Sequence, residues 1–201
     1  MNNRDFFNLA AAKWDESVYH DKDKLEYIFD FIGTKERAKI LDVGCGTGAL
    51  FPYILRFFPN SEITAVDIAE NMLEIAKKKF TDERIKFING DALTLTGYDG
   101  YFDYILCYST FPHLDKALAT IKFADMLSCG GALAIFHSQS RKAINSLHKG
   151  MNLDCSPYLP DAETVKDYLS CVGIDKIKII DNEEMYVITG VKVRGRFDNL
   201  R

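Results

Sequence analysis

The sequence predicts a doubly wound α/β domain, with helices on both faces of one mostly parallel seven-stranded sheet and one antiparallel edge strand in a C-terminal hairpin. Two observations lead to this fold class. Short β-branched or apolar runs alternate with segments of helical period between residues 39 and 137, which is the pattern of a parallel sheet. Near the end of the chain, two extended runs flank a short polar turn, which predicts a hairpin.

The individual elements follow from these patterns. Five runs are predicted to be strands, at residues 39–43, 62–66, 85–88, 101–107 and 132–137. Three segments that place apolar residues three and four apart are predicted to be helices, at 49–57, 69–80 and 114–127. The hairpin strands are expected at 174–180 and 185–193, and residues 138–160 are expected to be an irregular loop. A loop of this length points to a role in substrate binding.

Bulk properties limit the class of protein. A chain of 201 residues fits a single domain, here 1–201, and no window is apolar enough to cross a bilayer. The formal net charge of −4 disfavours a nucleic-acid substrate, since nucleic-acid binders concentrate basic residues. Five cysteines without a CxxC pair, in a chain with no secretory signal at its start, predict reduced thiols and a cytoplasmic protein.

A glycine-rich turn follows the first predicted strand. The strand that ends at Val43 continues directly into Gly44, Gly46 and Gly48 and then into a helix. Glycines in this position allow a tight turn and let a ligand lie against the backbone. The same letters also satisfy the dinucleotide fingerprint, so an NAD-dependent oxidoreductase remains an alternative at this point.

Three carboxylates are predicted at the same edge of the sheet. Asp67 ends the second strand, where such folds accept hydrogen bonds from ribose hydroxyls; its alternative role is to cap the next helix. Asp42 lies two residues before the first glycine, and Asp91 follows the third strand. An acidic rim suits a cationic ligand, whereas a pyrophosphate prefers donors and positive charge.

In these motifs the chain resembles the class I S-adenosylmethionine-dependent methyltransferases, in particular the ubiquinone/menaquinone-methylase-like group. Five blocks occur in order: the Asp42 to Gly48 turn, Val66-Asp67, Gly90-Asp91-Ala92, residues 102–107 and residues 130–135. The resemblance implies the sheet order 3-2-1-4-5-7-6, S-adenosylmethionine as cofactor and S-adenosylhomocysteine as product.

The resemblance also implies roles for individual residues. Asp42 would anchor the methionine end, which the turn of Gly44, Cys45, Gly46 and Gly48 would line, and Asp67 would hold the ribose. Ile68 and Met72 would flank the adenine, whereas Asp91 and the Ala92 amide would bind its edge. Cys107 and Tyr108 would lie near the methionine portion and the sulfonium.

The acceptor side is less specific. His113 follows the fourth strand and is a candidate general base together with Tyr108; the alternative is that His113 only starts the next helix. The chain lacks the Asn/Asp-Pro-Pro-Tyr/Phe signature of related amino-methyltransferases in this region. Methyl transfer is a displacement in which alignment supplies most of the catalysis, so a base is optional.

Two further regions are candidates for acceptor binding. Arg141 and His148 lie in the predicted loop 138–160, where Arg141 suits an anionic substrate. A metal held by His137, His148 and Asp154 or Cys155 is disfavoured, since this spacing matches no ordinary zinc pattern, and ordinary loop polarity is the default. Residues 1–33 are expected to form a helical lid that brings Trp14 to the substrate, although aromatic residues at helical spacing are more often core.

Taken together, these features predict S-adenosylmethionine-dependent methyl transfer to a small-molecule acceptor. A non-catalytic S-adenosylmethionine-binding module is the alternative from another class. The sequence leaves the acceptor, the methylated atom and the oligomeric state open.

Overall fold

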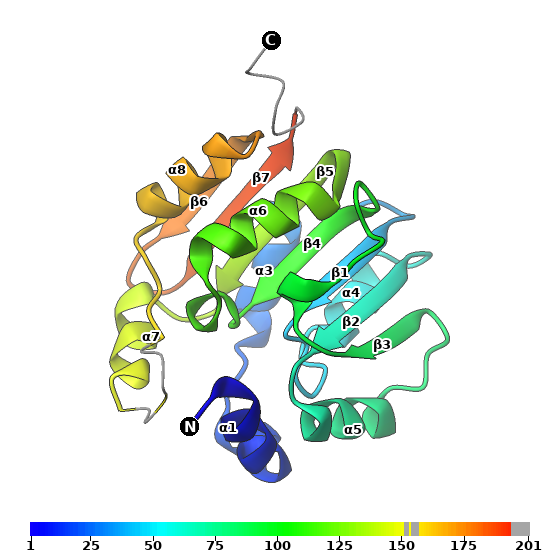
Figure 1. The fold of residues 1–201 in the computed structure, drawn as a ribbon, viewed down its shortest axis with the longest axis vertical. Helices are drawn as coiled ribbons and strands as arrows, with labels where there is room; N and C mark the ends of the chain where they lie inside the picture. Colours follow the sequence, from blue (N-terminus) through cyan, green and yellow to red (C-terminus); the bar gives the residue numbers. More distant parts are fainter. Residues whose placement is uncertain (151–152, 154–156, 194–201) are drawn as a thin grey trace.

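The computed structural model describes residues 1–150, 153 and 157–193. These residues form a seven-stranded sheet in the order β3-β2-β1-β4-β5-β7-β6 (Figure 1). The strands are β1 (Lys39–Val43), β2 (Glu62–Asp67), β3 (Ile85–Asn89), β4 (Phe102–Tyr108), β5 (Leu127–His137), β6 (Ile174–Asp181) and β7 (Tyr186–Lys192). The predicted fold class and strand order are confirmed.

The direction of the strands follows the prediction except in one detail. The pairs among β1 to β5 are all parallel, whereas β7 is antiparallel to both of its neighbours, β5 and β6. The antiparallel strand therefore lies one place inside the edge, which β6 occupies, and not at the edge itself. The two strands of a hairpin run antiparallel to each other. Because the second strand, β7, pairs antiparallel with β5, the first strand, β6, lies at the edge and runs in the same direction as β5.

Helices cover both faces of the sheet (Figure 1). The α-helices are α1 (Asn3–Ala10), α2 (Trp14–Ser17), α3 (Lys22–Ile32), α4 (Phe51–Phe57), α5 (Glu70–Lys79), α6 (Lys116–Met126), α7 (Arg141–His148) and α8 (Ala162–Cys171). Three short 3₁₀ helices are η1 (Ala11–Lys13), η2 (Ala92–Thr94) and η3 (Phe111–His113). No helix in the described part of the chain has the length and apolar character needed to span a bilayer.

The core consists of two layers, one on each face of the sheet. Leu41 in β1 belongs to the layer that contains Phe123 of α6 and Leu169 of α8. Its neighbour Ile40 belongs to the opposite layer, with Phe29 of α3. Since successive strand residues point to opposite faces, continuous apolar strands are what a sheet covered on both sides requires.

The predicted irregular stretch 138–160 is wrong in part, because α7 occupies its first half. Ser140 caps this helix, as its Oγ accepts a hydrogen bond from the Ala143 amide at 3.2 Å. Ile144 and His148, one turn apart, are both buried. Ala143, Ile144 and Leu147 do recur at helical spacing, but the helix has only eight residues, which is shorter than the window over which such a pattern is recognised.

Candidate functional site

A cavity of about 400 Å³ lies at the carboxyl ends of the parallel strands. Its lining comes from the ends of β1, β2 and β4, from the segments that follow β3 and β4, and from the N-terminal helices. Figure 1 shows α1 beyond the carboxyl ends of the strands, next to α5. Open α/β sheets place their ligands at this edge, so the cavity is the candidate site.

The glycine turn forms one wall of the cavity. The amides of Gly44 and Cys45 both donate to the Val66 carbonyl, at 2.8 and 3.0 Å, which ties the turn to β2. Gly44 has a φ of +66°, and a Cβ there would collide with the side chain of Thr110. Gly46, at φ +53°, has open space where a Cβ would stand, so its backbone faces the cavity. Gly48 does not line the cavity and instead packs closely against Phe51.

Asp67 joins this turn to the next strand. One carboxylate oxygen accepts from the Gly46 amide and the other from the Ala69 amide, each at 2.8 Å. Burial raises the pKa of Asp67, and these backbone donors oppose that shift. The side chain also lines the cavity, where its remaining lone pairs are able to accept from a ligand's hydroxyl groups. The helix-capping and ligand-binding interpretations are therefore compatible.

Asp42 is a buried carboxyl group behind the turn. It is 1% exposed, and its Oδ2 has no hydrogen-bond partner within the described chain. Burial, helped by the charge of Asp67, raises the pKa of Asp42 to about 8. Asp42 does not itself line the cavity. A cationic group bound close to it would stabilise the ionised form.

Most of the other predicted cofactor residues lie at the cavity. Ile68, Met72, Asp91 and Ala92 all line the cavity, as does Cys45. Asp91 also begins η2, since its Oδ1 accepts from the Leu93 amide at 2.8 Å.

Cys107 differs from the other predicted cofactor residues, because the structure does not bring it to the cavity. It is fully buried in the layer that contains Phe123 and Ala119 of α6. The alternation of β4 explains this, because the adjacent Tyr108 points to the opposite face.

The N-terminal helices close the cavity on another side. Asn3, Phe7, Trp14, Val18 and His20 all contribute to its lining.

A second set of contacts fixes this segment, residues 3–20, to the rest of the domain. Asp15 accepts a hydrogen bond from Thr47 Oγ1 at 2.5 Å. It also forms an ion pair with Lys79 Nζ at 2.7 Å. Thr47 lies within the glycine turn. The N-terminal segment is thus tied directly to the wall that the turn forms.

His113 and Tyr108 both line the cavity. His113 ends η3, and Asp115, not His113, caps α6 by accepting from the Leu118 amide at 2.9 Å. The His113 ring packs edge-on against Phe7, at 5.1 Å between ring centroids, and against His148 at 4.8 Å. Burial, then the nearby His148 and Lys116, lowers the pKa of His113 to about 3.

His148 and His137 lie outside the cavity lining. Burial lowers the pKa of His137 to about 3, and neither of its ring nitrogens has a partner among the described residues. The described residues contain no group of three or more His, Cys, Asp or Glu side chains arranged to hold a metal ion. Asp154 and Cys155, which we considered as ligands, lie outside the described residues.

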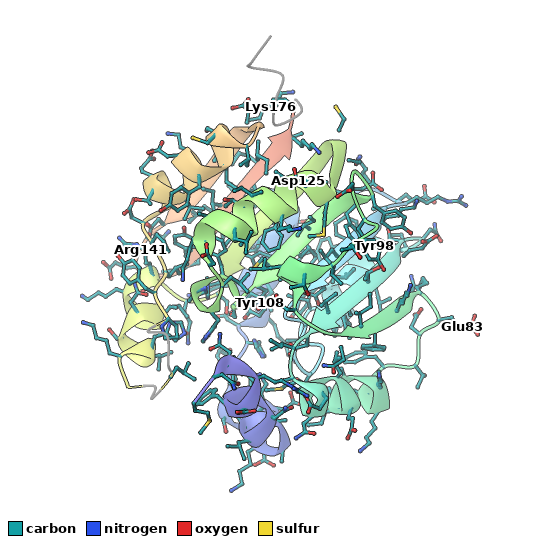
Figure 2. All side chains as sticks on the ribbon, in the orientation of Figure 1. Glu83, Tyr98, Tyr108, Asp125, Arg141 and Lys176 are labelled. Carbon is teal, nitrogen blue, oxygen red and sulfur yellow. The ribbon has the colours of Figure 1, made fainter. Side chains whose placement is uncertain are left out.

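Arg141 is not part of the cavity. Its Nε donates to Asp181 Oδ2 at 3.0 Å, and Figure 2 shows Arg141 at the start of α7, well apart from Tyr108. The anionic-substrate role predicted for Arg141 has no support from this position, because its guanidinium already has a carboxylate partner.

Sequence reasoning missed His20, which lines the cavity. His20 Nδ1 lies 2.9 Å from the Tyr108 hydroxyl, although the two residues are 88 positions apart. A contact between residues so far apart leaves no local pattern in the sequence. Ser109 has a φ of +54°, a left-handed conformation that is uncommon outside glycine and concentrates at functional sites.

Comparisons with known proteins agree with this geometry. A family model described as a methyltransferase domain matches residues 40–131. The chain is similar to a malonyl-[acyl-carrier protein] O-methyltransferase of Geobacter sulfurreducens, with 30% identity over 90% of this chain and 73% of that protein. It is also 34% identical to the corresponding enzyme of Priestia megaterium, over 58% of this chain, but spans only 43% of that relative's length.

A solved structure shows the same fold. Phosphoethanolamine N-methyltransferase 2 of Haemonchus contortus, in complex with S-adenosyl-L-methionine, superimposes with a TM-score of 0.76 at 16% identity. The superposition covers 96% of this chain and 60% of that one.

Proposed function

Because this chain belongs to the class I S-adenosylmethionine-dependent methyltransferases, we propose that it transfers the methyl group of S-adenosylmethionine to a small-molecule acceptor held in the cavity. The observation that carries this proposal is the convergence of the glycine turn, Asp67 and the segment after β3 on one cavity. The N-terminal segment, residues 3–20, would act as the lid over it.

The residues present fit this cofactor. Asp67 would accept from the ribose hydroxyls, and the open backbone at Gly46 would allow the methionine part to lie close. The lining contains Asp67, Asp91 and Asp115 and no Lys or Arg among the described residues, which suits a ligand with a cationic amino-acid end and is unfavourable for a pyrophosphate. This second point favours S-adenosylmethionine over NAD, the alternative that the glycine pattern left open.

The cofactor supplies a methyl group on a good leaving group, so the protein has to align the acceptor and exclude water. The lid residues Phe7 and Trp14, together with Leu114 and Leu118 of the segment after β4, provide apolar surface for this purpose. A cavity of about 400 Å³ fits a small ligand. A small molecule is therefore our proposed acceptor; nucleic acid stays disfavoured, and a cytoplasmic location stays a prediction.

The acceptor named for the curated relatives is a malonyl group on an acyl-carrier protein. A malonyl group ends in a carboxylate, which is already a nucleophile and needs no base. His113 and Tyr108 are the catalytic candidates predicted from the sequence, and both line the cavity.

Calorimetric titration with S-adenosylhomocysteine tests the proposal. We expect Asp67→Ala to weaken binding at least about 100-fold, because charge-assisted hydrogen bonds to two hydroxyls are lost. The exposed Asp99 offers a matched control, and Asp99→Ala should bind like the unmodified protein. Unchanged affinity of Asp67→Ala, or binding of NAD in place of S-adenosylhomocysteine, would overturn the cofactor assignment. Tight binding without methyl transfer to any acceptor would indicate a binding module.

A further inference from the structure

A chain of hydrogen bonds connects the N-terminal lid to the end of two strands. His20 Nδ1 lies 2.9 Å from Tyr108 Oη, and Tyr108 Oη lies 3.0 Å from Ser138 Oγ. Tyr108 ends β4, and Ser138 directly follows β5. The central position of Tyr108 at this edge of the sheet is visible in Figure 2. These two hydrogen bonds fix the orientation of the His20 ring at the wall of the cavity.

The second ring nitrogen of His20 has no such partner. Nε2 is buried and makes no hydrogen bond to the described residues, although His20 lines the cavity. A buried polar atom without a partner is unfavourable, so we expect a bound molecule to supply that partner. When Nδ1 donates to Tyr108 and Tyr108 donates to Ser138, Nε2 carries a free lone pair.

The charges around the cavity restrict the molecule that Nε2 would meet. The lining contains Asp67, Asp91 and Asp115, but no Lys or Arg among the described residues. Arg141 is paired with Asp181 elsewhere, and Lys79 is paired with Asp15. A carboxylate acceptor would therefore enter an acidic cavity with no fixed cation to receive it, which is unfavourable in a site of low dielectric.

We propose, on the basis of the function proposed above, that His20 is the catalytic base and that the acceptor presents an uncharged hydroxyl or thiol group. The acceptor's oxygen or sulfur forms the bond to the methyl carbon, while the bond between that carbon and the sulfonium sulfur breaks and leaves its electron pair on sulfur. The acceptor's proton passes to His20 Nε2. Tyr108 is a positioning residue, since it acts through the His20 ring.

The surroundings of the two cavity histidines differ in a way that favours His20. Burial lowers the pKa of His20, Asp15 on the same segment partly opposes that shift, and Lys79, the ion-pair partner of Asp15, adds to it. The imidazolium formed by proton transfer thus has a carboxylate close by to stabilise it. His113 has His148 and Lys116 as its charged neighbours, and both disfavour its protonation. Of the two, only His20 is also oriented by a hydrogen-bonded partner at its other nitrogen.

The first test is independent of any acceptor. Nitrogen-15 NMR of histidine-labelled protein, saturated with S-adenosylhomocysteine at pH 7.5, reports which ring nitrogen of His20 is protonated. We expect a proton on Nδ1 and none on Nε2. Tyr108→Phe should abolish the preference by removing the partner of Nδ1. A proton on Nε2 in the unmodified protein would make His20 a donor and overturn its role as base.

The second test measures methyl transfer to four probes. Three are similar in size and differ in the reacting group: 4-methylphenol, 4-methylbenzenethiol and benzylamine. The fourth, malonyl-coenzyme A, carries the malonyl group named for the curated relatives. The phenol or thiol should be the preferred acceptor. His20→Asn, whose amide is able to keep the bond to Tyr108, should lower kcat at least about 100-fold and remove the acidic limb of the pH–rate profile. Tyr27→Asn, at an exposed position outside the lid and the cavity lining, is the control and should retain both.

The outcomes separate this proposal from the broader one. Preference for malonyl-coenzyme A or benzylamine, or transfer to neither the phenol nor the thiol, would overturn the acceptor class. A 100-fold loss in His113→Asn with full activity in His20→Asn would make His113 the base. If the unmodified protein does not bind S-adenosylhomocysteine, that result would instead contradict the proposed function itself.

Discussion

The two halves of the cavity are built differently. The cofactor half consists of the glycine turn, Asp67 and the residues after β3. These follow or end three neighbouring strands, β1, β2 and β3, whose last residues pair with one another. The acceptor half brings together residues 3–20, Tyr108 and the segment up to Leu118. The first half is held by backbone geometry and the second by side-chain contacts between distant segments. Changes in the two halves should therefore have different effects.

The largest effect is expected in the backbone of the cofactor half. Gly44→Ala places a Cβ against Thr110 in a left-handed conformation, so we expect at least about a 100-fold loss of S-adenosylhomocysteine affinity in calorimetry. Gly97 also has a positive φ, +80°, but has open space around it. Gly97→Ala is thus the control for conformational strain alone, at a cost of about 1 kcal/mol in unfolding free energy and none in affinity. Equal behaviour of the two variants would show that the turn does not contact the cofactor.

Acid should destabilise the domain through two buried histidines, His113 in the acceptor half and His137 outside the cavity lining. The pKa values of His113 and His137 are lowered to about 3, so below pH 6.5 the unfolded chain takes up protons that the folded chain does not. Stability is then lost as the pH falls from 6.5 toward 3, by up to about 1.4 kcal/mol per pH unit for each histidine. Urea unfolding at pH 7.0 and 5.5 measures this loss, and His137→Gln should reduce it. An identical loss in that variant would show that His137 is not buried in its neutral form.

Ligand binding in the cofactor half should also weaken in acid, but through Asp42 and in a higher pH range. The pKa of Asp42 is about 8 in the free protein, and a cationic ligand would favour its ionised form. Binding would then release a proton, so the affinity for S-adenosylhomocysteine should rise with pH up to about 8, by at most tenfold per pH unit. Calorimetry from pH 6 to 8 checks this, and Asp42→Asn should remove the slope. A flat profile in the unmodified protein would separate Asp42 from the ligand.

The smallest effect defines where the acceptor half ends. Arg141 is paired with Asp181 outside the cavity, and exposed ion pairs contribute about 0–1 kcal/mol. Arg141→Ala should therefore change KM for the acceptor less than threefold and lower the unfolding free energy only slightly. A tenfold higher KM for the acceptor, measured in the methyl-transfer assay, would extend the site to α7.

The same division explains how much the sequence could predict. Asp42, Asp67 and the glycines are local signals, because a strand end, a turn and an acid at fixed spacing lie within a few residues of each other. The hairpin followed from a similar short-range pattern, whereas the strand order was implied by the family resemblance. His20 gave no signal, because its role depends on Tyr108, 88 positions away. Cys107 was assigned to the ligand by motif position, but the alternation of β4 turns it into the core.

The most direct test of the central claim compares one residue from each half in the same titration. We expect Asp67→Ala to weaken S-adenosylhomocysteine binding at least about 100-fold, whereas His20→Asn should bind within threefold of the unmodified protein. An equal loss of affinity in both variants would contradict the division of the cavity into a cofactor half and an acceptor half.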